Sequence, residues 1–201
     1  MVTRFCKYHA LGNDYLVLNP SDLAGELDAF RIQRICHRNF GVGSDGILLG
    51  PLETKEGDFG LRIFNPDGSE AEKSGNGLRI FSRYLWDQGL VREKAFTVMT
   101  LGGKVESVVK DGGRTVTVQM GQVSFDSTRI PVKGEPREVL KESMTVEGEE
   151  LQFCAATVGN PHCVVLRTDH PEEEAKRLGP FIEKDSRFPN RTNVQFMKVL
   201  D

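Results

Sequence analysis

Residues 65–79 read NPDGSEAEKSGNGLR, and this stretch is the most informative part of the chain. It opens with a turn-forming Asn-Pro-Asp-Gly-Ser run and continues into Ser-Gly-Asn-Gly at residues 74–77. Apolar residues at helical spacing follow as far as residue 88, and Gly89 suits the position after a helix end. Because Ser is a favoured N-cap, Ser74 is expected to lie just before this helix. The stretch therefore predicts a turn followed by a helix with a polar, glycine-rich start.

Hydrophobic periodicity along the rest of the chain predicts an α+β fold. Helices are expected at residues 28–38, 77–88 and 171–184, and strands at residues 15–18, 46–50, 59–64, 96–99, 104–109 and 114–120. The last two strands are joined by Asp-Gly-Gly, which is typical of a hairpin. From Gly121 the chain is expected to cross to a second unit, which predicts domains at 1–120 and 121–201.

Composition excludes several classes of function. The net charge of −3 gives no reason to expect binding to nucleic acid or to an anionic membrane. No run approaches the ~18 consecutive apolar residues of a membrane span, and the N-terminal residues lack the apolar core of a signal peptide. Four cysteines without a Cys-x-x-Cys pair favour a reduced, cytoplasmic protein. No cluster has metal-ligand spacing, so no metal site is predicted.

Residues 41–46 match the pattern G-x-G-x-x-G, which occurs in dinucleotide-binding proteins. That fingerprint opens a helix after a strand, whereas this run leads into the apolar strand segment that follows it. The sequence therefore predicts no nucleotide cofactor.

A weak internal repeat relates the two predicted domains. Gly12-Asn13 precedes one strand and Gly159-Asn160 precedes another, with an offset of 147 residues between the two asparagines. Each strand is followed by a helical stretch, a basic turn and a further strand. The repeat predicts two related halves with a site in the cleft between them. Chance remains an alternative, because Gly-Asn before a strand is also ordinary turn chemistry.

The stretch at 65–79 resembles the diaminopimelate epimerase family, whose members carry N-x-D-G-S followed by C-G-N-G-x-R. The resemblance is strong around residues 12–18, 38–49, 65–84 and 159–165, and faint at 121–155. It implies a diaminopimelate-epimerase-like α+β fold of two pseudo-symmetric halves. Each half is a curved, mostly antiparallel sheet around a central helix, and the second half is incomplete in this sequence.

The same resemblance implies a cofactor-independent amino-acid epimerase that interconverts LL- and meso-diaminopimelate for lysine and peptidoglycan precursors. Its only predicted ligand is this small-molecule substrate, and a homodimer is compatible with it. In the family, two thiols exchange the α-proton without pyridoxal phosphate, because a thiol with a pKa near ~8.5 can act as acid or base. The resemblance implies catalytic roles at two positions, Ser74 and His162. It implies substrate-binding roles at six others: Asn13, Asn65, Gly75, Asn76, Asn160 and Asn193.

Ser74 stands where the family has its first catalytic cysteine. A hydroxyl is a far weaker acid than a thiol, so three roles remain open: an N-cap only, an N-cap that also contacts substrate, or a proton donor. A deliberate Cys-to-Ser change is a further alternative. The backbone N–H groups of residues 75–77 suit a substrate carboxylate, which we expect to be held there without a cationic residue. His162 could equally be a turn histidine, and Cys163 is interpreted as a core residue.

The repeat offset carries Ser74 to position 221, beyond Asp201. The family's second C-G-T-G-type motif and its Glu-Arg pair are absent from these residues as well. We therefore expect either a fragment or a shortened relative, without epimerase turnover in this 201-residue form. Two other functions stay open: a one-base isomerase or dehydratase of the same superfamily, and a non-catalytic amino-acid-binding relative.

Overall fold

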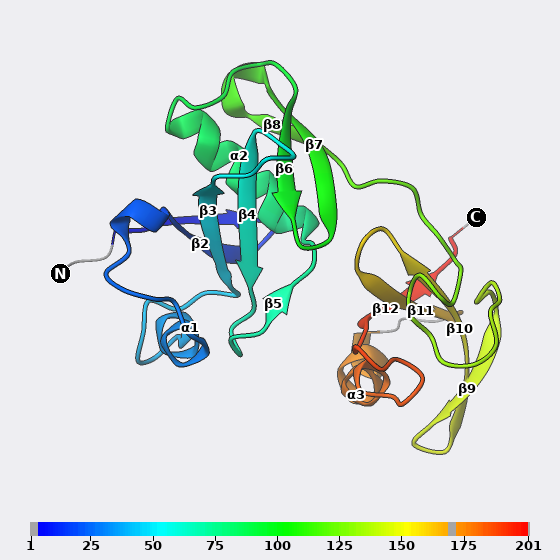
Figure 1. The fold of residues 1–201 in the computed structure, drawn as a ribbon. Coiled ribbons are helices and arrows are strands. Elements are labelled where there is room, and N and C mark those ends of the chain that lie inside the picture. Colours follow the sequence, from blue (N-terminus) through cyan, green and yellow to red (C-terminus); the bar gives the residue numbers. More distant parts are fainter. Residues whose placement is uncertain (1–3, 169–171, 201) are drawn as a thin grey trace. The chain divides into compact units, whose positions relative to one another are not determined.

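A computed structural model describes residues 4–168 and 172–200, and the chain divides into two compact units, residues 1–120 and 121–201. Both units combine helices with a sheet, as the sequence predicts (Figure 1). In the described part of the chain, no helix is long and apolar enough to cross a membrane. The same residues contain no cluster of three or more His, Cys, Asp or Glu side chains suited to a metal ion.

The first unit is built on one eight-stranded sheet. Its strands are β1 (Cys6–Ala10), β2 (Asn13–Leu18), β3 (Ile47–Leu52), β4 (Phe59–Phe64), β5 (Glu70–Ala71), β6 (Phe96–Thr100), β7 (Gly103–Lys110) and β8 (Thr115–Gln119). The order is β1-β2-β3-β4-β6-β7-β8, and β5 pairs with β4. Two helices, α1 (Ala29–Cys36) and α2 (Gly75–Asp87), and two short 3-10 turns, η1 (Pro20–Asp22) and η2 (Asp111–Gly113), complete this unit.

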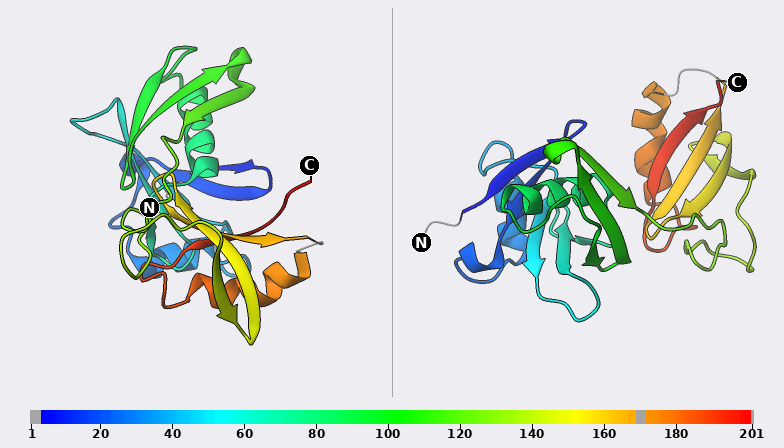
Figure 2. Two further views of the ribbon diagram at one scale, coloured as in Figure 1. Left: turned by 90° about the vertical axis from the view of Figure 1, so that its right-hand side faces the viewer. Right: turned by 90° about the horizontal axis from the view of Figure 1, so that it is seen from above.

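The sheet of the first unit is covered on both faces near its middle. Alternate residues of β2 separate into two cores: Tyr15 and Val17 pack with α2, while Leu16 and Leu18 pack with α1. Because both faces are buried, β2 reads as a continuous apolar run rather than as an alternating one. The sheet curves around α2, as both views of Figure 2 show. The curvature brings the first turn of α2 close to the N-terminal end of β2.

Helix α2 begins and ends where its capping residues place it. The Ser74 hydroxyl accepts a hydrogen bond from the Gly77 backbone N–H at 3.0 Å, which confirms the predicted N-cap. The helix begins at Gly75, two residues before the expected start. At the other end, Gly89 has a φ of 71°, the left-handed conformation expected after a helix. The cap thus fixes where the backbone N–H groups of the first turn point.

The second unit has a four-stranded sheet in the order β12-β11-β10-β9. Its elements are β9 (Glu142–Val146), β10 (Glu149–Thr157), β11 (Pro161–Arg167), α3 (Glu172–Glu183) and β12 (Asn193–Lys198). Leu178 and Ile182 of α3 pack on Phe153 and Val165 of the sheet. Strand β11 runs parallel to β12 and antiparallel to β10.

Candidate active site

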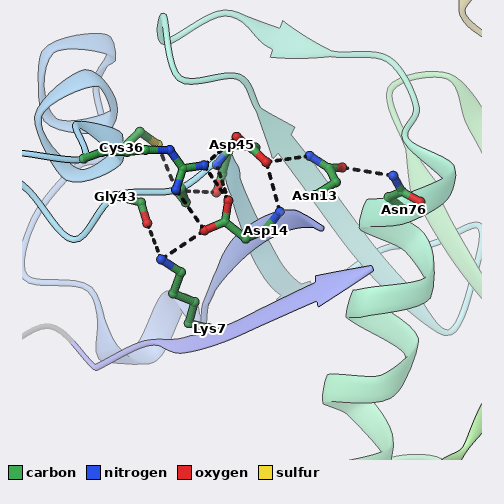
Figure 3. Close-up of polar contacts among 10 residues, drawn as sticks. Lys7, Asn13, Asp14, Cys36, Gly43, Asp45 and Asn76 are labelled. Carbon is green, nitrogen blue, oxygen red and sulfur yellow. Dashed lines mark hydrogen bonds and ion pairs between the residues drawn. The ribbon is translucent and has the colours of Figure 1, made fainter. Parts of the chain in front are cut away.

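Four of the predicted site residues come together where β2 begins and α2 begins. Asn13 is the first residue of β2, and Ser74, Gly75 and Asn76 form the N-terminus of α2. The Asn76 side-chain Nδ2 donates to Asn13 Oδ1 at 3.1 Å, which links the two elements directly (Figure 3). Asn13 follows a two-residue turn, Leu11-Gly12, in which both residues have positive φ, so the tight turn itself places the Asn13 side chain.

Outside its own helix, the Ser74 hydroxyl contacts the Tyr15 hydroxyl. Its Oγ lies 3.4 Å from the Tyr15 hydroxyl and accepts from the Gly77 N–H. Burial raises the pKa of Tyr15, the hydrogen bond with Ser74 lowers it, and the nearby Asp45 charge raises it. Tyr15 therefore remains a neutral phenol at neutral pH, able to donate to Ser74 Oγ. An alcohol in this setting is held in place but is not converted into a strong base.

A charged network lies behind Asn13, and sequence reasoning did not find it. Arg38 Nη2 binds Asp14 Oδ1 and Asp45 Oδ1, each at 2.7 Å, and Lys7 Nζ reaches Asp14 Oδ2 at 3.0 Å. Hydrogen bonding from Arg38 is the main reason that the pKa of Asp14 lies well below its ordinary value; burial acts the other way, and Lys7 adds to the lowering. Asp14 directly follows Asn13 in sequence, and this adjacency was the one available signal.

Asp45 joins this network to the site. Its Oδ2 accepts from Asn13 Nδ2 at 3.0 Å and from the Asp14 backbone N–H at 3.1 Å. The Asp45 backbone N–H in turn donates to the Asp14 carbonyl at 2.8 Å. The loop before β3 is thereby fastened to the start of β2, as Figure 3 shows.

One glycine of the site is fixed by packing and another is not. Gly46 occupies a position where some family members have a side-chain contact. A Cβ there would lie 2.5 Å from the Phe64 carbonyl and 2.6 Å from the Tyr15 ring, so no side chain fits. A Cβ on Gly75 would meet nothing closer than 3.8 Å. That Cβ would make ordinary van der Waals contact with the Arg79 and Met120 side chains, so packing does not require glycine at position 75.

Asn65 lies in its own turn. Its Nδ2 donates to Ser69 Oγ at 3.0 Å. Its backbone N–H donates to the Ser69 carbonyl, and its carbonyl accepts from the Gly68 N–H. The Asn-Pro-Asp-Gly-Ser turn thus forms as the sequence predicts. The convergence of Asn65 with Asn13 on one ligand stays a prediction.

In the second unit, the three predicted residues lie together at the start of β11 and β12. His162 Nε2 lies 3.1 Å from Asn160 Oδ1, and its Nδ1 lies 3.4 Å from Gln195 Oε1. Asn193 is opposite His162 in the parallel ladder, and its Nδ2 donates to the Pro161 carbonyl at 2.9 Å. The imidazole is half-buried, and a neutral ring has one N–H, so it donates to one of these two amide oxygens at a time. The shorter contact, with Asn160, orients the ring.

The thiol next to this histidine is structural. Cys163 is fully buried in the core of the second unit, and burial raises its pKa to about 12. A thiol in that state has no reactive thiolate at neutral pH. The interpretation of Cys163 as a core residue is confirmed.

Comparison with known proteins agrees with this geometry. The family model described as diaminopimelate epimerase matches residues 5–125. Diaminopimelate epimerase 2 of Nostoc sp. is 64% identical over 98% of this chain and 70% of its own length. The diaminopimelate epimerase of Methanothermobacter thermautotrophicus is 40% identical over 98% of this chain and 71% of its own.

Solved structures with the same fold are more distant in sequence. A hydroxyproline epimerase from Agrobacterium vitis matches with a TM-score of 0.59 at 18% identity, covering 90% of this chain and 54% of that one. A Bacillus anthracis phenazine biosynthesis protein of the PhzF family matches with a TM-score of 0.52 at 19% identity, covering 98% and 66%. These similarities support the predicted fold. The family match and the sequence identities above show that this chain belongs to the diaminopimelate epimerase family, a family of isomerases.

Proposed function

We propose that this chain forms the substrate-binding scaffold of a cofactor-independent epimerase that interconverts LL- and meso-diaminopimelate. Ser74 holds the substrate in this proposal and is a poor proton-transfer group. The observation that carries the proposal is the hydrogen bond between Asn13 and Asn76 at the first turn of α2. The relatives that share this chain's sequence are named diaminopimelate epimerases. A cytoplasmic setting and a homodimer stay predictions.

The start of α2 suits a substrate carboxylate. Backbone N–H groups there point out of the helix, and the helix dipole favours an anion. Gly75 leaves room for the anion to approach the backbone. That the carboxylate is held without a cationic residue stays a prediction. The Arg79 guanidinium hydrogen-bonds Asn76 Oδ1 and so brings a positive charge near this turn.

Ser74 limits the chemistry that the first unit can perform. Epimerisation requires a base on one face of the α-carbon and an acid on the other. The Ser74 Oγ already accepts the Gly77 N–H, and its neighbour Tyr15 is neutral. Neither group provides a base of useful strength. We therefore expect the 201-residue chain to bind diaminopimelate without exchanging its α-proton.

A second candidate rests on a specific observation in the other unit. His162 has both ring nitrogens within hydrogen-bond distance of amide oxygens of Asn160 and Gln195. A one-base isomerase or dehydratase needs only one oriented acid–base group, which the His162 imidazole would supply. Such an enzyme exchanges a proton on only one face of its substrate.

The test follows the α-proton of LL-diaminopimelate by NMR in D₂O, with the unchanged chain and with Ser74→Cys. We expect no exchange above a protein-free control for the unchanged chain. In a full-length protein that also carries the second motif, Ser74→Cys should raise exchange roughly 10²–10⁴-fold over the same protein with Ser74. Ser74→Ala is the matched control, because it removes the hydroxyl without adding a thiol. Exchange by the unchanged chain would contradict the inert role of Ser74. A folded Ser74→Cys protein without any gain would favour the one-base or binding-only alternatives.

A further inference from the structure

We propose that Asp45 and Arg79 are positioning residues that fix the orientation of two site amides. The four residues form what we term the amide chain: Asp45, Asn13, Asn76 and Arg79. Asp45 lies in the loop before β3, Asn13 begins β2, and the other two lie in the first turns of α2. The orientation concerns the folded protein itself. Its consequence for substrate rests on the function proposed above.

The hydrogen bonds of the amide chain all run in one direction. Arg79 Nη2 donates to Asn76 Oδ1, Asn76 Nδ2 donates to Asn13 Oδ1 at 3.1 Å, and Asn13 Nδ2 donates to Asp45 Oδ2 at 3.0 Å. Each amide therefore accepts from one neighbour and donates to the next. Hydrogen bonds in such a series polarise one another, so a change at one end is felt along it.

The two ends determine this direction. A carboxylate only accepts hydrogen bonds, and a guanidinium only donates them. If the Asn13 amide were turned over, its oxygen would face the Asp45 carboxylate. If the Asn76 amide were turned over, its NH₂ group would face the Arg79 guanidinium. An asparagine amide alone can take either orientation, but between these two ends only one arrangement pairs every group.

The Asp45 carboxylate, which is the accepting end of the amide chain, is itself held by hydrogen bonds to both of its oxygens. Its Oδ1 accepts from Arg38 at 2.7 Å, which leaves Oδ2 for Asn13 and for the Asp14 backbone N–H. The carboxylate therefore cannot rotate without losing a charge-assisted bond. Arg38 and Asp14 thus support the amide chain from behind.

The direction of the hydrogen bonds in the amide chain determines which amide groups are left to bind a ligand. An asparagine NH₂ group has two N–H bonds, and the amide chain uses one from Asn13 and one from Asn76. One N–H of each amide remains for a carboxylate bound at the start of α2. The opposite orientation would present carbonyl oxygens, which repel an anion. Asp45 and Arg79 would thus select for anion binding through the amides.

Side-chain amide NMR tests the orientation without any ligand. The ¹⁵N-¹H signals of Asn13 and Asn76 are assigned by their loss in Asn13→Asp and Asn76→Asp. We expect Arg79→Met to shift the Asn13 signals as well as those of Asn76, although Arg79 bonds only Asn76 in the amide chain. Arg79→Lys keeps a donor and should return both sets toward their original positions. The matched control is Arg83→Met, one turn further along α2, because Arg83 bonds Asp87 and the Gly113 carbonyl instead.

Asp45→Asn tests the other end of the amide chain. It should shift the Asn76 signals, because the change reaches Asn76 through Asn13. A normal backbone spectrum shows that each variant is folded. Asn13 signals that stay unchanged in Arg79→Met, or Asn76 signals unchanged in Asp45→Asn, overturn the proposal.

A binding measurement then separates this proposal from the proposed function. With LL-diaminopimelate as the probe in calorimetry, Arg79→Met should weaken binding about tenfold, the scale of one hydrogen bond to a charged group, and Arg79→Lys much less. If the unchanged protein does not bind this probe, the proposed function fails and the NMR result alone decides on the amide chain. If it binds and Arg79→Met binds equally well, the amide chain has no positioning role.

Discussion

The two units share one structural frame but carry different polar contacts on it. In each, an antiparallel strand pair leads through a helix into a parallel third strand: β1-β2-α1-β3 in the first unit and β10-β11-α3-β12 in the second. Leu16 pairs with Ile47, and Cys163 pairs with Val194. Asn13 and Asn160 are 147 residues apart in the sequence. The same offset leads from Leu16 to Cys163 and from Ile47 to Val194. The weak sequence repeat therefore coincides with equal register in the two ladders.

The frames differ at Asn13 and Asn160, the asparagines that the repeat relates. The turn before the second strand has two residues in the first unit and three in the second, where Thr157 pairs with Pro161. Asn13 is therefore inside its strand and bonds a carboxylate and an amide, whereas Asn160 stays in the turn and contacts His162. One frame thus supports a charged amide network and the other an oriented imidazole. The shared strand pairing places the two asparagines at corresponding positions. The length of the preceding turn determines which side chains each of them contacts.

The largest expected effect comes from Gly46 and its counterpart at the same offset, Asn193. Gly46→Ala should lower the free energy of unfolding by about 3 kcal/mol, because a Cβ would overlap the Phe64 carbonyl and the Tyr15 ring. Asn193→Ala should cost within about 0.5 kcal/mol, since that side chain is exposed. Urea unfolding of both variants measures the difference. Equal losses would show that the two frames do not differ here.

Asp14 should make the stability of the first unit depend on pH. Its counterpart in the second unit at the same offset is Pro161, which has no titratable side chain. The folded-state pKa of Asp14 is depressed, chiefly by Arg38, so the unfolded chain binds more protons near pH 4. Its stabilisation is therefore complete above the ordinary aspartate pKa and is lost as pH falls from about 4 toward the folded value. We expect about 2 kcal/mol of stability to depend on this titration.

The measurement compares unfolding free energies of the unchanged protein and Asp14→Asn at pH 7 and pH 3. The variant should be less stable at pH 7, and the difference should shrink at pH 3. A difference that is the same at both pH values would show that the Asp14 charge does not stabilise the first unit.

Elements with a strong local pattern were predictable from sequence. The strand at 59–64 was placed with both ends correct, because glycine and a turn motif bound an apolar run there. Helix α2 was found with its cap, since Ser74 and Gly89 both follow local rules. Strands β1, β9 and β10 were not predicted. Every residue of strand β1 is at least partly exposed, and much of β9 and β10 lies where the family resemblance is faint.

The polar partners of the site were not predictable in the same way. The Asn13–Asp45 bond spans 32 residues and the Asn13–Asn76 bond spans 63, so no local pattern encodes either. The family motif indicated Asn13 and Asn76 separately, but only the fold shows that they touch. Tyr15 lies in the predicted strand at residues 15–18 and is buried, yet its hydroxyl lies 3.4 Å from Ser74 Oγ. Long-range side-chain pairing is therefore the information that one sequence lacks.

The smallest expected effect separates the two remaining roles of Ser74 by comparing two caps in the first unit. Asp28 caps α1 as Ser74 caps α2, since Asp28 Oδ1 accepts from the Arg31 N–H at 2.8 Å. Asp28→Ala and Ser74→Ala should each cost about 1 kcal/mol of stability through the lost cap. Only Ser74→Ala should also weaken binding of LL-diaminopimelate in calorimetry, because Ser74 lies beside Asn76 at the proposed carboxylate site. If both variants keep unchanged affinity, Ser74 is an N-cap and nothing more. If Asp28→Ala weakens binding equally, the loss reflects general destabilisation, and the assignment of Ser74 to the ligand site is wrong.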